Sequence, residues 1–149
     1  MAIVPLDNEN VHAIYDNETK LLLVTYKGIL SPQVTNEFYT WVFGIMKENP
    51  TLIMEARGSI FDFRDVKDFV NSNLSTVRKQ SQTVNQNVEA RNHPVALLVK
   101  TTLQERMVAV TLKLTPQNDR KKIVFSMDEA KEYITAWHKK QESVGEENP

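Results

Sequence analysis

Three aspartates, Asp62, Asp65 and Asp68, recur at every third residue and begin inside the apolar run 59–63. Carboxylates at the end of a strand can hold Mg²⁺ or assist phosphoryl transfer, and ligands of open parallel sheets usually bind at that edge. Such a site also needs a glycine-rich phosphate loop, and none follows. Arg64 and Lys67 alternate with the acids, so the pattern favours a solvated connection with local ion pairs. We predict no metal site and no cofactor there.

The three histidines, His12, His93 and His138, lie far apart in the sequence and none has the spacing of a metal-ligand pair. His93 precedes Pro94 and is predicted to lead into a strand. His138 stands in a basic stretch, which suits the C-terminal part of a helix. We therefore predict structural or solvent-facing roles for all three.

Nucleophilic catalysis has no support in the sequence. Gly58 and Ser59 stand at the start of a predicted strand and do not form the G-x-S-x-G turn between a strand and a helix. The four glycines make neither a dinucleotide-binding nor a phosphate-binding motif, and the absence of cysteine excludes thiolate chemistry. These observations predict a protein without catalytic residues, hence not an enzyme.

The composition is that of an ordinary globular chain, with 149 residues, 41% hydrophobic residues and a formal net charge of -1. This charge offers no field to attract nucleic acid or anionic lipid. The small basic cluster 120–122 is predicted to be a solvated turn. The N-terminal residues lack the features of a signal peptide, and no apolar run is long enough for a membrane span. We expect a cytoplasmic protein with one domain over residues 1–149 and a frayed tail at 143–149.

The hydrophobic periodicity predicts alternating strands and helices. Period-two and continuous apolar runs predict five strands, at 11–15, 21–26, 59–63, 94–100 and 122–125. Spacings of three and four predict helices at 32–49, 73–91, 103–114 and from 127 onward. The order implies an α/β fold: a mostly parallel five-stranded sheet with an N-terminal antiparallel hairpin, four helices and a (βα) superhelix.

Two sequence pairs predict where the last two helices begin. Thr102 with Glu105, and Ser126 with Glu129, have the spacing of a capping box, in which the two side chains bond each other's backbone N–H groups.

Four aromatic residues crowd the first predicted helix: Phe38, Tyr39, Trp41 and Phe43. Together they cover more of the helix circumference than one inward stripe requires. Packing against a neighbouring helix is the favoured interpretation. The alternative is an apolar patch for a ligand or for a homodimer.

The segments SIFDFRDV at 59–66 and VNSNL at 70–74, with the overall element order, resemble the SpoIIAA-like family. These are STAS-type anti-sigma-factor antagonists, which regulate bacterial transcription by binding other proteins. In that family an Asp-Ser-Ser-Gly loop opens a helix, and its first serine is a phosphorylation switch. Here Val70, Asn71 and Asn73 replace the aspartate, the first serine and the glycine, and only Ser72 fits the pattern.

The resemblance implies a non-enzymatic module that binds a protein partner through the loop after the third predicted strand. The residues it singles out are Asp62, Arg64, Asp65, Asn71 and Ser72, with Ser72 as the candidate phospho-acceptor. A phosphate there would lie at a helix N-terminus, where free backbone N–H groups favour anions. The second hypothesis is binding of a lipid or another apolar small molecule between the first predicted helix and its neighbours, and it is motivated by the four aromatic residues of that helix. Divergent members of the family are sometimes grouped with lipid-binding folds.

Overall fold

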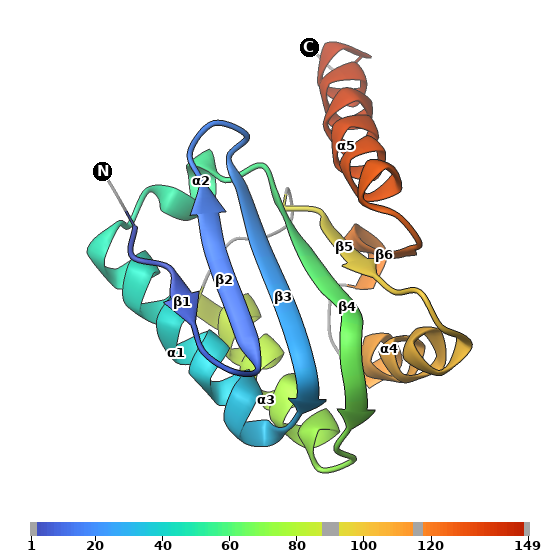
Figure 1. Ribbon diagram of the computed structural model, residues 1–149. Helices are drawn as coiled ribbons and strands as arrows, with labels where there is room; N and C mark the ends of the chain where they lie inside the picture. The colour runs from blue at the N-terminus through green and yellow to red at the C-terminus, as the bar shows by residue number, and fades with distance from the viewer. Residues whose placement is uncertain (1–2, 88–92, 115–117, 148–149) are drawn as a thin grey trace.

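The computed structural model describes residues 3–87, 93–114 and 118–147 (Figure 1). It contains one mixed sheet of six strands that lie in chain order. The first three strands are antiparallel to one another, and the third to the sixth are parallel. The strands are β1 Leu6–Asp7, β2 Val11–Asp16, β3 Leu21–Leu30, β4 Gly58–Phe69, β5 Val95–Leu98 and β6 Lys121–Val124.

The helices form a layer on each face of the sheet. They are α1 Pro32–Glu48, the short α2 Leu52–Glu55, α3 Asn73–Asn87, α4 Thr102–Leu114 and α5 Met127–Glu147, with a 3₁₀ turn at Asn118–Arg120. In Figure 1, α1 and α3 lie behind the sheet and α5 extends from its β5–β6 end. The α5 residues Ala130 and Ile134 pack against Ile60, Ala96 and Leu98, on the face opposite to the other long helices.

The predicted fold class is confirmed: an α/β fold with an N-terminal antiparallel hairpin, parallel strands after it and four long helices. The number of strands differs, because two-residue β1 pairs with β2 and raises the count to six. A strand of two residues is too short to show period-two alternation, so the sequence could not reveal it.

The third and fourth strands are longer than predicted. β3 continues through Gly28, whose φ is 69°, and β4 continues through the charged stretch as far as Phe69. Their parallel pairing shifts register between Thr25 and Lys27. The predicted charged connection at 64–68 is therefore wrong. A strand continues through charged residues as long as its backbone groups pair with the neighbouring strand. The turn after β4 therefore starts only at Val70.

Of the two predicted capping pairs, capping geometry agrees with the sequence at one and differs at the other. The Ser31 hydroxyl accepts from the Val34 N–H at 3.4 Å at the start of α1, and Ser126 accepts from Glu129 N–H at 3.1 Å before α5. At α4 the cap is Thr101, which accepts from the N–H of Gln104 at 3.1 Å. The predicted pair of Thr102 and Glu105 is therefore displaced by one residue.

One helix end differs from expectation, and another cannot be compared within the described residues. α5 is helical as far as Glu147, where the sequence predicted a frayed tail from 143. α3 ends at Asn87 within the described part, and the rest of the predicted helix, 88–91, lies outside the described residues.

Candidate functional site

Asp62 and Arg64, two of the residues predicted to form a loop, bind each other within β4. The Arg64 guanidinium donates from Nε and Nη2 to the two carboxylate oxygens of Asp62, at 3.0 and 2.9 Å. Asp62 is 8% exposed. Its hydrogen bond raises the pKa of Arg64 above the ordinary value. The carboxylate of Asp62 is thus bound by an arginine of its own strand.

The other three predicted residues lie apart from this pair. Asp65 is exposed on β4, and Asn71 and Ser72 are exposed in the turn before α3. The residue after them, Asn73, is buried and accepts from the Thr35 hydroxyl at 2.6 Å. This bond fixes the start of α3 against α1, so the turn is exposed but firmly placed.

The described residues contain no group of three or more His, Cys, Asp or Glu side chains that could hold a metal ion. Within the same ranges no helix is both long and apolar enough to cross a membrane.

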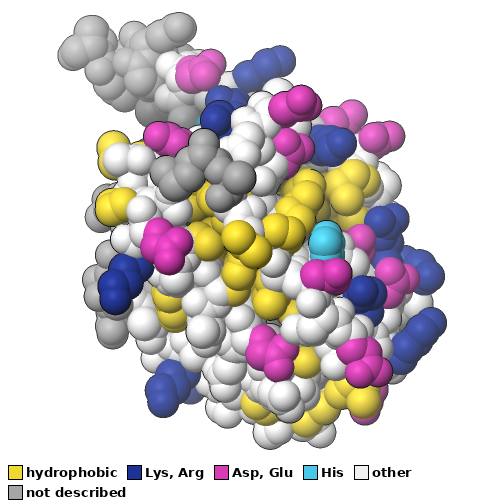
Figure 2. Space-filling model, turned by 60° about the vertical axis from the view of Figure 1, so that its left-hand side comes forward, with side chains coloured by type: hydrophobic (Ala, Val, Ile, Leu, Met, Phe, Trp, Pro, Cys, Tyr) yellow, Lys and Arg dark blue, Asp and Glu magenta, His cyan; other side chains and the backbone are white. Residues whose placement is uncertain are grey.

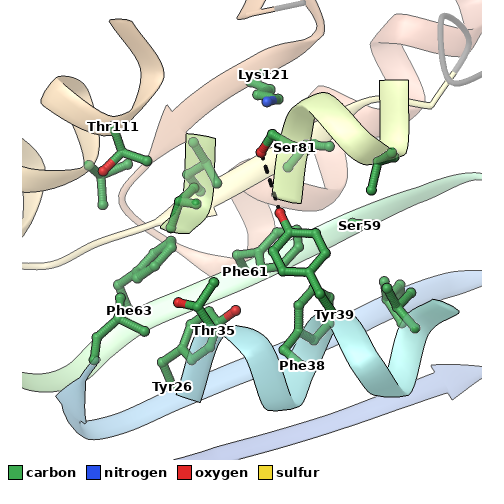
Figure 3. A pocket seen from close by; sticks show the side chains of 18 of the residues that line it. Tyr26, Thr35, Phe38, Tyr39, Ser59, Phe61, Phe63, Ser81, Thr111 and Lys121 are labelled. Carbon is green, nitrogen blue, oxygen red and sulfur yellow. Dashed lines mark hydrogen bonds between the residues drawn. The ribbon is translucent and has the colours of Figure 1, made fainter. Parts of the chain in front are cut away.

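An apolar cavity lies elsewhere, between the sheet and the layer formed by α1, α3 and α4 (Figure 3). Its volume is about 210 Å³. Alternate β4 residues, Ser59, Phe61 and Phe63, line one wall, as the period of a strand requires. The ring of Tyr26 stacks on Phe61 and Phe63 at centroid distances of 6.4 and 5.5 Å. Aliphatic side chains of the helices complete the lining, among them Val77 of α3.

The four aromatic residues of α1 separate into two groups. Phe38 is 2% exposed and lines the cavity together with Tyr39. Trp41 donates from its indole N–H to the Val4 carbonyl at 2.8 Å, and the ring of Phe43 lies 5.9 Å from that of Tyr39. All four residues are buried or partly buried. The structure therefore places two of them at a cavity and two beside other residues of the chain.

One end of the cavity is polar, and we call it the polar end. Ser59 Oγ lies 2.6 Å from His93 Nε2, and Arg120 donates from Nη1 to the His93 carbonyl at 2.9 Å. The hydroxyls of Tyr39 and Ser81 are 3.4 Å apart. Lining residues of this end are Tyr39, Ser59, Ser81, His93, Arg120 and Lys121.

Burial lowers the pKa values of the three basic side chains at the polar end. Desolvation, followed by the charges of Arg120 and His138, lowers the pKa of His93 to about 4, so its imidazole is neutral at pH 7. Desolvation, with repulsion from Arg120, lowers the pKa of Lys121 to about 8. Arg120 is 6% exposed, and burial lowers its pKa from the ordinary value without removing its charge at neutral pH.

The Ser59–His93 pair has the spacing of a nucleophile and its base. Catalytic pairs of this kind usually have a third group that orients the imidazole. Here the buried Nδ1 of His93 has no hydrogen-bond partner within the described part of the chain. Among the described residues the pair thus lacks a third orienting group, and both side chains line the cavity.

The polar end could not be recognised from the sequence. Ser59 and His93 are 34 residues apart, and His93 and Arg120 are 27 apart, so no local spacing connects them. The prediction that 120–122 is a solvated turn is wrong for Arg120, which is buried. A basic residue in a turn normally faces water, and only the tertiary fold reverses this at Arg120.

No family model matches the chain, and no curated protein matches it either. An anti-sigma factor antagonist from Mycobacterium paratuberculosis superposes with a TM-score of 0.53 at 8% identity, over 84% of this chain and 94% of that one. An uncharacterized protein of the DUF3478 family with a SpoIIAA-like fold, from Shewanella loihica PV-4, gives a TM-score of 0.59 at 12% identity, over 87% and 98%. This chain has the SpoIIAA-like fold.

The structural resemblance confirms the fold that the sequence motifs suggested. The surface shown in Figure 2 carries acidic and basic side chains interspersed, with hydrophobic side chains exposed between them. This face has no extended patch of one sign of charge of the kind that nucleic-acid binding requires.

Proposed function

We propose that this protein is a non-enzymatic module that binds a small apolar molecule in the cavity between the sheet and helices α1, α3 and α4. The observation that carries the proposal is the cavity itself, about 210 Å³ of space lined mostly by apolar and aromatic side chains. Protein interiors normally close such spaces, because each one forfeits packing contacts. Ligand sites are typically apolar hollows with a few polar groups at defined points, and the polar end supplies those.

The cavity volume limits the size of the ligand. Drug-sized ligands occupy pockets of about 300 Å³ or more, whereas an apolar cavity of about 150 Å³ already binds benzene. The 210 Å³ cavity falls between these limits. A single short alkyl chain fits this space better than a two-chain lipid.

Methionine methyl groups give a direct test. Met46 and Met107 line the cavity, whereas Met54 is 84% exposed on α2. Methyl NMR of the full chain during titration with n-octanol should shift the signals of Met46 and Met107 in a saturable manner and leave Met54 in place. If all three methyl groups move together without saturation, or none moves, the proposal is wrong.

A pair of variants on α3 provides the functional control. Val77 lines the cavity, and Lys79, two residues further along, is exposed. Val77→Trp fills the space and should weaken n-octanol binding by about tenfold or more, while Lys79→Trp should leave it unchanged. Mass spectrometry of an organic extract of the purified protein then identifies any natural ligand.

A second candidate function is the binding of a protein partner at the turn between β4 and α3. Two observations support it: Asn71 and Ser72 are exposed on a firmly placed turn, and one structural neighbour is named as an anti-sigma factor antagonist. Phosphorylation of Ser72 would add charge at the start of α3. Affinity capture from the source cell should recover a partner with the unmodified protein and lose it with Ser72→Glu. Equal recovery with both proteins would reject a phospho-switch.

A further inference from the structure

The polar end of the cavity defines the chemistry of the ligand more narrowly. Two cationic side chains, Arg120 and Lys121, line this end, and the described lining residues include no Asp or Glu. The remaining lining residues are apolar or aromatic, apart from Thr35, Asn73 and Thr111. An apolar space with positive charge at one end is suited to an amphiphile whose head group is an anion.

The hydrogen-bonding groups at this end are connected. Arg120 donates to the His93 carbonyl, and the His93 ring is bonded to Ser59. The Nδ1 atom of His93 is buried and has no hydrogen-bond partner within the described ranges. A neutral imidazole that accepts the Ser59 proton at Nε2 carries its own hydrogen at Nδ1, where it lacks an acceptor.

We infer that the ligand is a medium-chain monocarboxylic acid, with its alkyl chain among the aromatic side chains of the cavity and its carboxylate at the polar end beside Lys121 and Arg120. This inference rests on the proposed function and specifies the head group. The close-up places Lys121 on the side of the cavity where the Tyr39 and Ser81 hydroxyls meet (Figure 3). Arg120 and Lys121 also interact with other residues, so the carboxylate would join an existing network.

Charge at neutral pH supports this assignment. Arg120 stays a cation, and Lys121, with a pKa of about 8, is mostly protonated at pH 7. A fatty acid carboxyl is ionised at the same pH. Burying this anion would be costly in a wholly apolar cavity, and cations already placed there offset the cost.

The experiment compares ligands that share one chain and differ in the head group: octanoate, n-octanol and octylamine, titrated calorimetrically into the full chain at pH 7. Octanoate should bind at least about tenfold more tightly than n-octanol, and octylamine should bind most weakly. Equal affinity for octanoate and n-octanol would overturn the carboxylate assignment and leave the apolar cavity intact as a binding site. Failure of all three to bind would reject the proposed function as well.

Adjacent lysines on β6 make a matched pair of variants. Lys121 lines the cavity, whereas Lys122 is exposed and holds its Nζ 5.8 Å from the centroid of the Tyr133 ring. Lys121→Met keeps most of the side-chain volume and should weaken octanoate binding by about tenfold while leaving n-octanol binding unchanged. Lys122→Met should change neither affinity. The same loss of octanoate affinity in both variants would contradict a local role for Lys121 and indicate a long-range charge effect.

Discussion

Ser59 Oγ on β4 and His93 Nε2, just before β5, lie 2.6 Å apart at the polar end of the cavity. The bond joins residues 34 positions apart and holds the imidazole among Ser59, Arg120 and His138. Burial, followed by electrostatic repulsion from Arg120 and His138, lowers the pKa of this imidazole to about 4, so it is neutral at pH 7. The polar end is therefore sensitive to acid.

Acid should destabilise the fold through His93. Its pKa is about 4 in the folded chain, against an ordinary value of 6.5 that the unfolded chain retains. Between these values the unfolded state binds more protons, so the stabilisation is fully present above pH 6.5 and is lost as pH falls toward 4. The free energy of unfolding should drop by roughly 2–4 kcal/mol across that window.

Urea unfolding at several pH values measures this contribution. His93→Gln removes the titrating ring and should flatten the pH dependence between 4 and 6.5 relative to the original protein. The explanation fails if this variant retains the original slope.

Gly58 should not tolerate even a methyl group. A Cβ at this position would lie 2.8 Å from the Pro94 carbonyl oxygen and 3.2 Å from a methyl of Ile134. The backbone oxygen cannot move aside, because Ser59 N–H donates to it at 3.1 Å. Gly58→Ala should therefore lower the free energy of unfolding by about 2 kcal/mol or more.

A second glycine is the matched control. Gly44 lies in α1, and a Cβ there would meet nothing within 4 Å. Gly44→Ala should raise the free energy of unfolding by about 0.5–1 kcal/mol, since alanine loses less backbone entropy in a helix. Urea denaturation of the two variants should thus give changes of opposite sign, and changes of the same sign would refute the account of Gly58.

The aromatic residues of α1 should differ sharply in their contribution to stability. Phe38 is buried between the sheet and the cavity, and its ring contacts that of Phe61 at a centroid distance of 5.4 Å. Phe38→Ala should lower the free energy of unfolding by about 3–5 kcal/mol. Phe43 is partly exposed and stays outside the cavity lining, so Phe43→Ala should lower it by about 1 kcal/mol or less. A similar loss in both variants would show that the two rings are equally part of the core.

The fold was predictable because its signals are local. Each long helix has an apolar stripe, β5 is a continuous apolar run, and Ser31 and Ser126 precede their helices as caps should. The strand β4 was predicted too short because its second half carries charged side chains at the exposed end of the sheet. The second half of β4 is a strand because its backbone pairs with β3. The pattern of its side chains does not reveal this pairing.

The candidate site was less predictable than the fold. Phe38 and Tyr39 could be named from the crowding of aromatics on one helix. Ser59, His93 and Arg120 meet only when β4, the start of β5 and the turn before β6 come together in the sheet. Their residue types are ordinary and their spacing carries no motif, so only the three-dimensional arrangement reveals the polar end.

The Gln104 side chain should contribute strongly to stability, because its hydrogen bonds connect the start of α4 with β4. Its side-chain oxygen accepts from the N–H groups of Lys100 and Thr101, at 2.9 and 3.2 Å. Its side-chain nitrogen donates to the carbonyls of Arg64 and Val66, at 3.0 and 3.2 Å. Because Gln104 is 4% exposed, water cannot replace these bonds readily in the folded protein.

Gln104→Leu keeps the volume of the side chain and leaves four backbone groups without their partner, so it should lower the free energy of unfolding by about 2–4 kcal/mol. Glu105 is the adjacent residue that the sequence pattern assigned to the cap, and it is exposed. Glu105→Leu should therefore change the free energy by no more than about 0.5 kcal/mol. Thermal and urea unfolding of the two variants show which side chain belongs to the cap of α4. A larger loss of stability for Glu105→Leu would show that the cap is the pair of Thr102 and Glu105 that the sequence predicted.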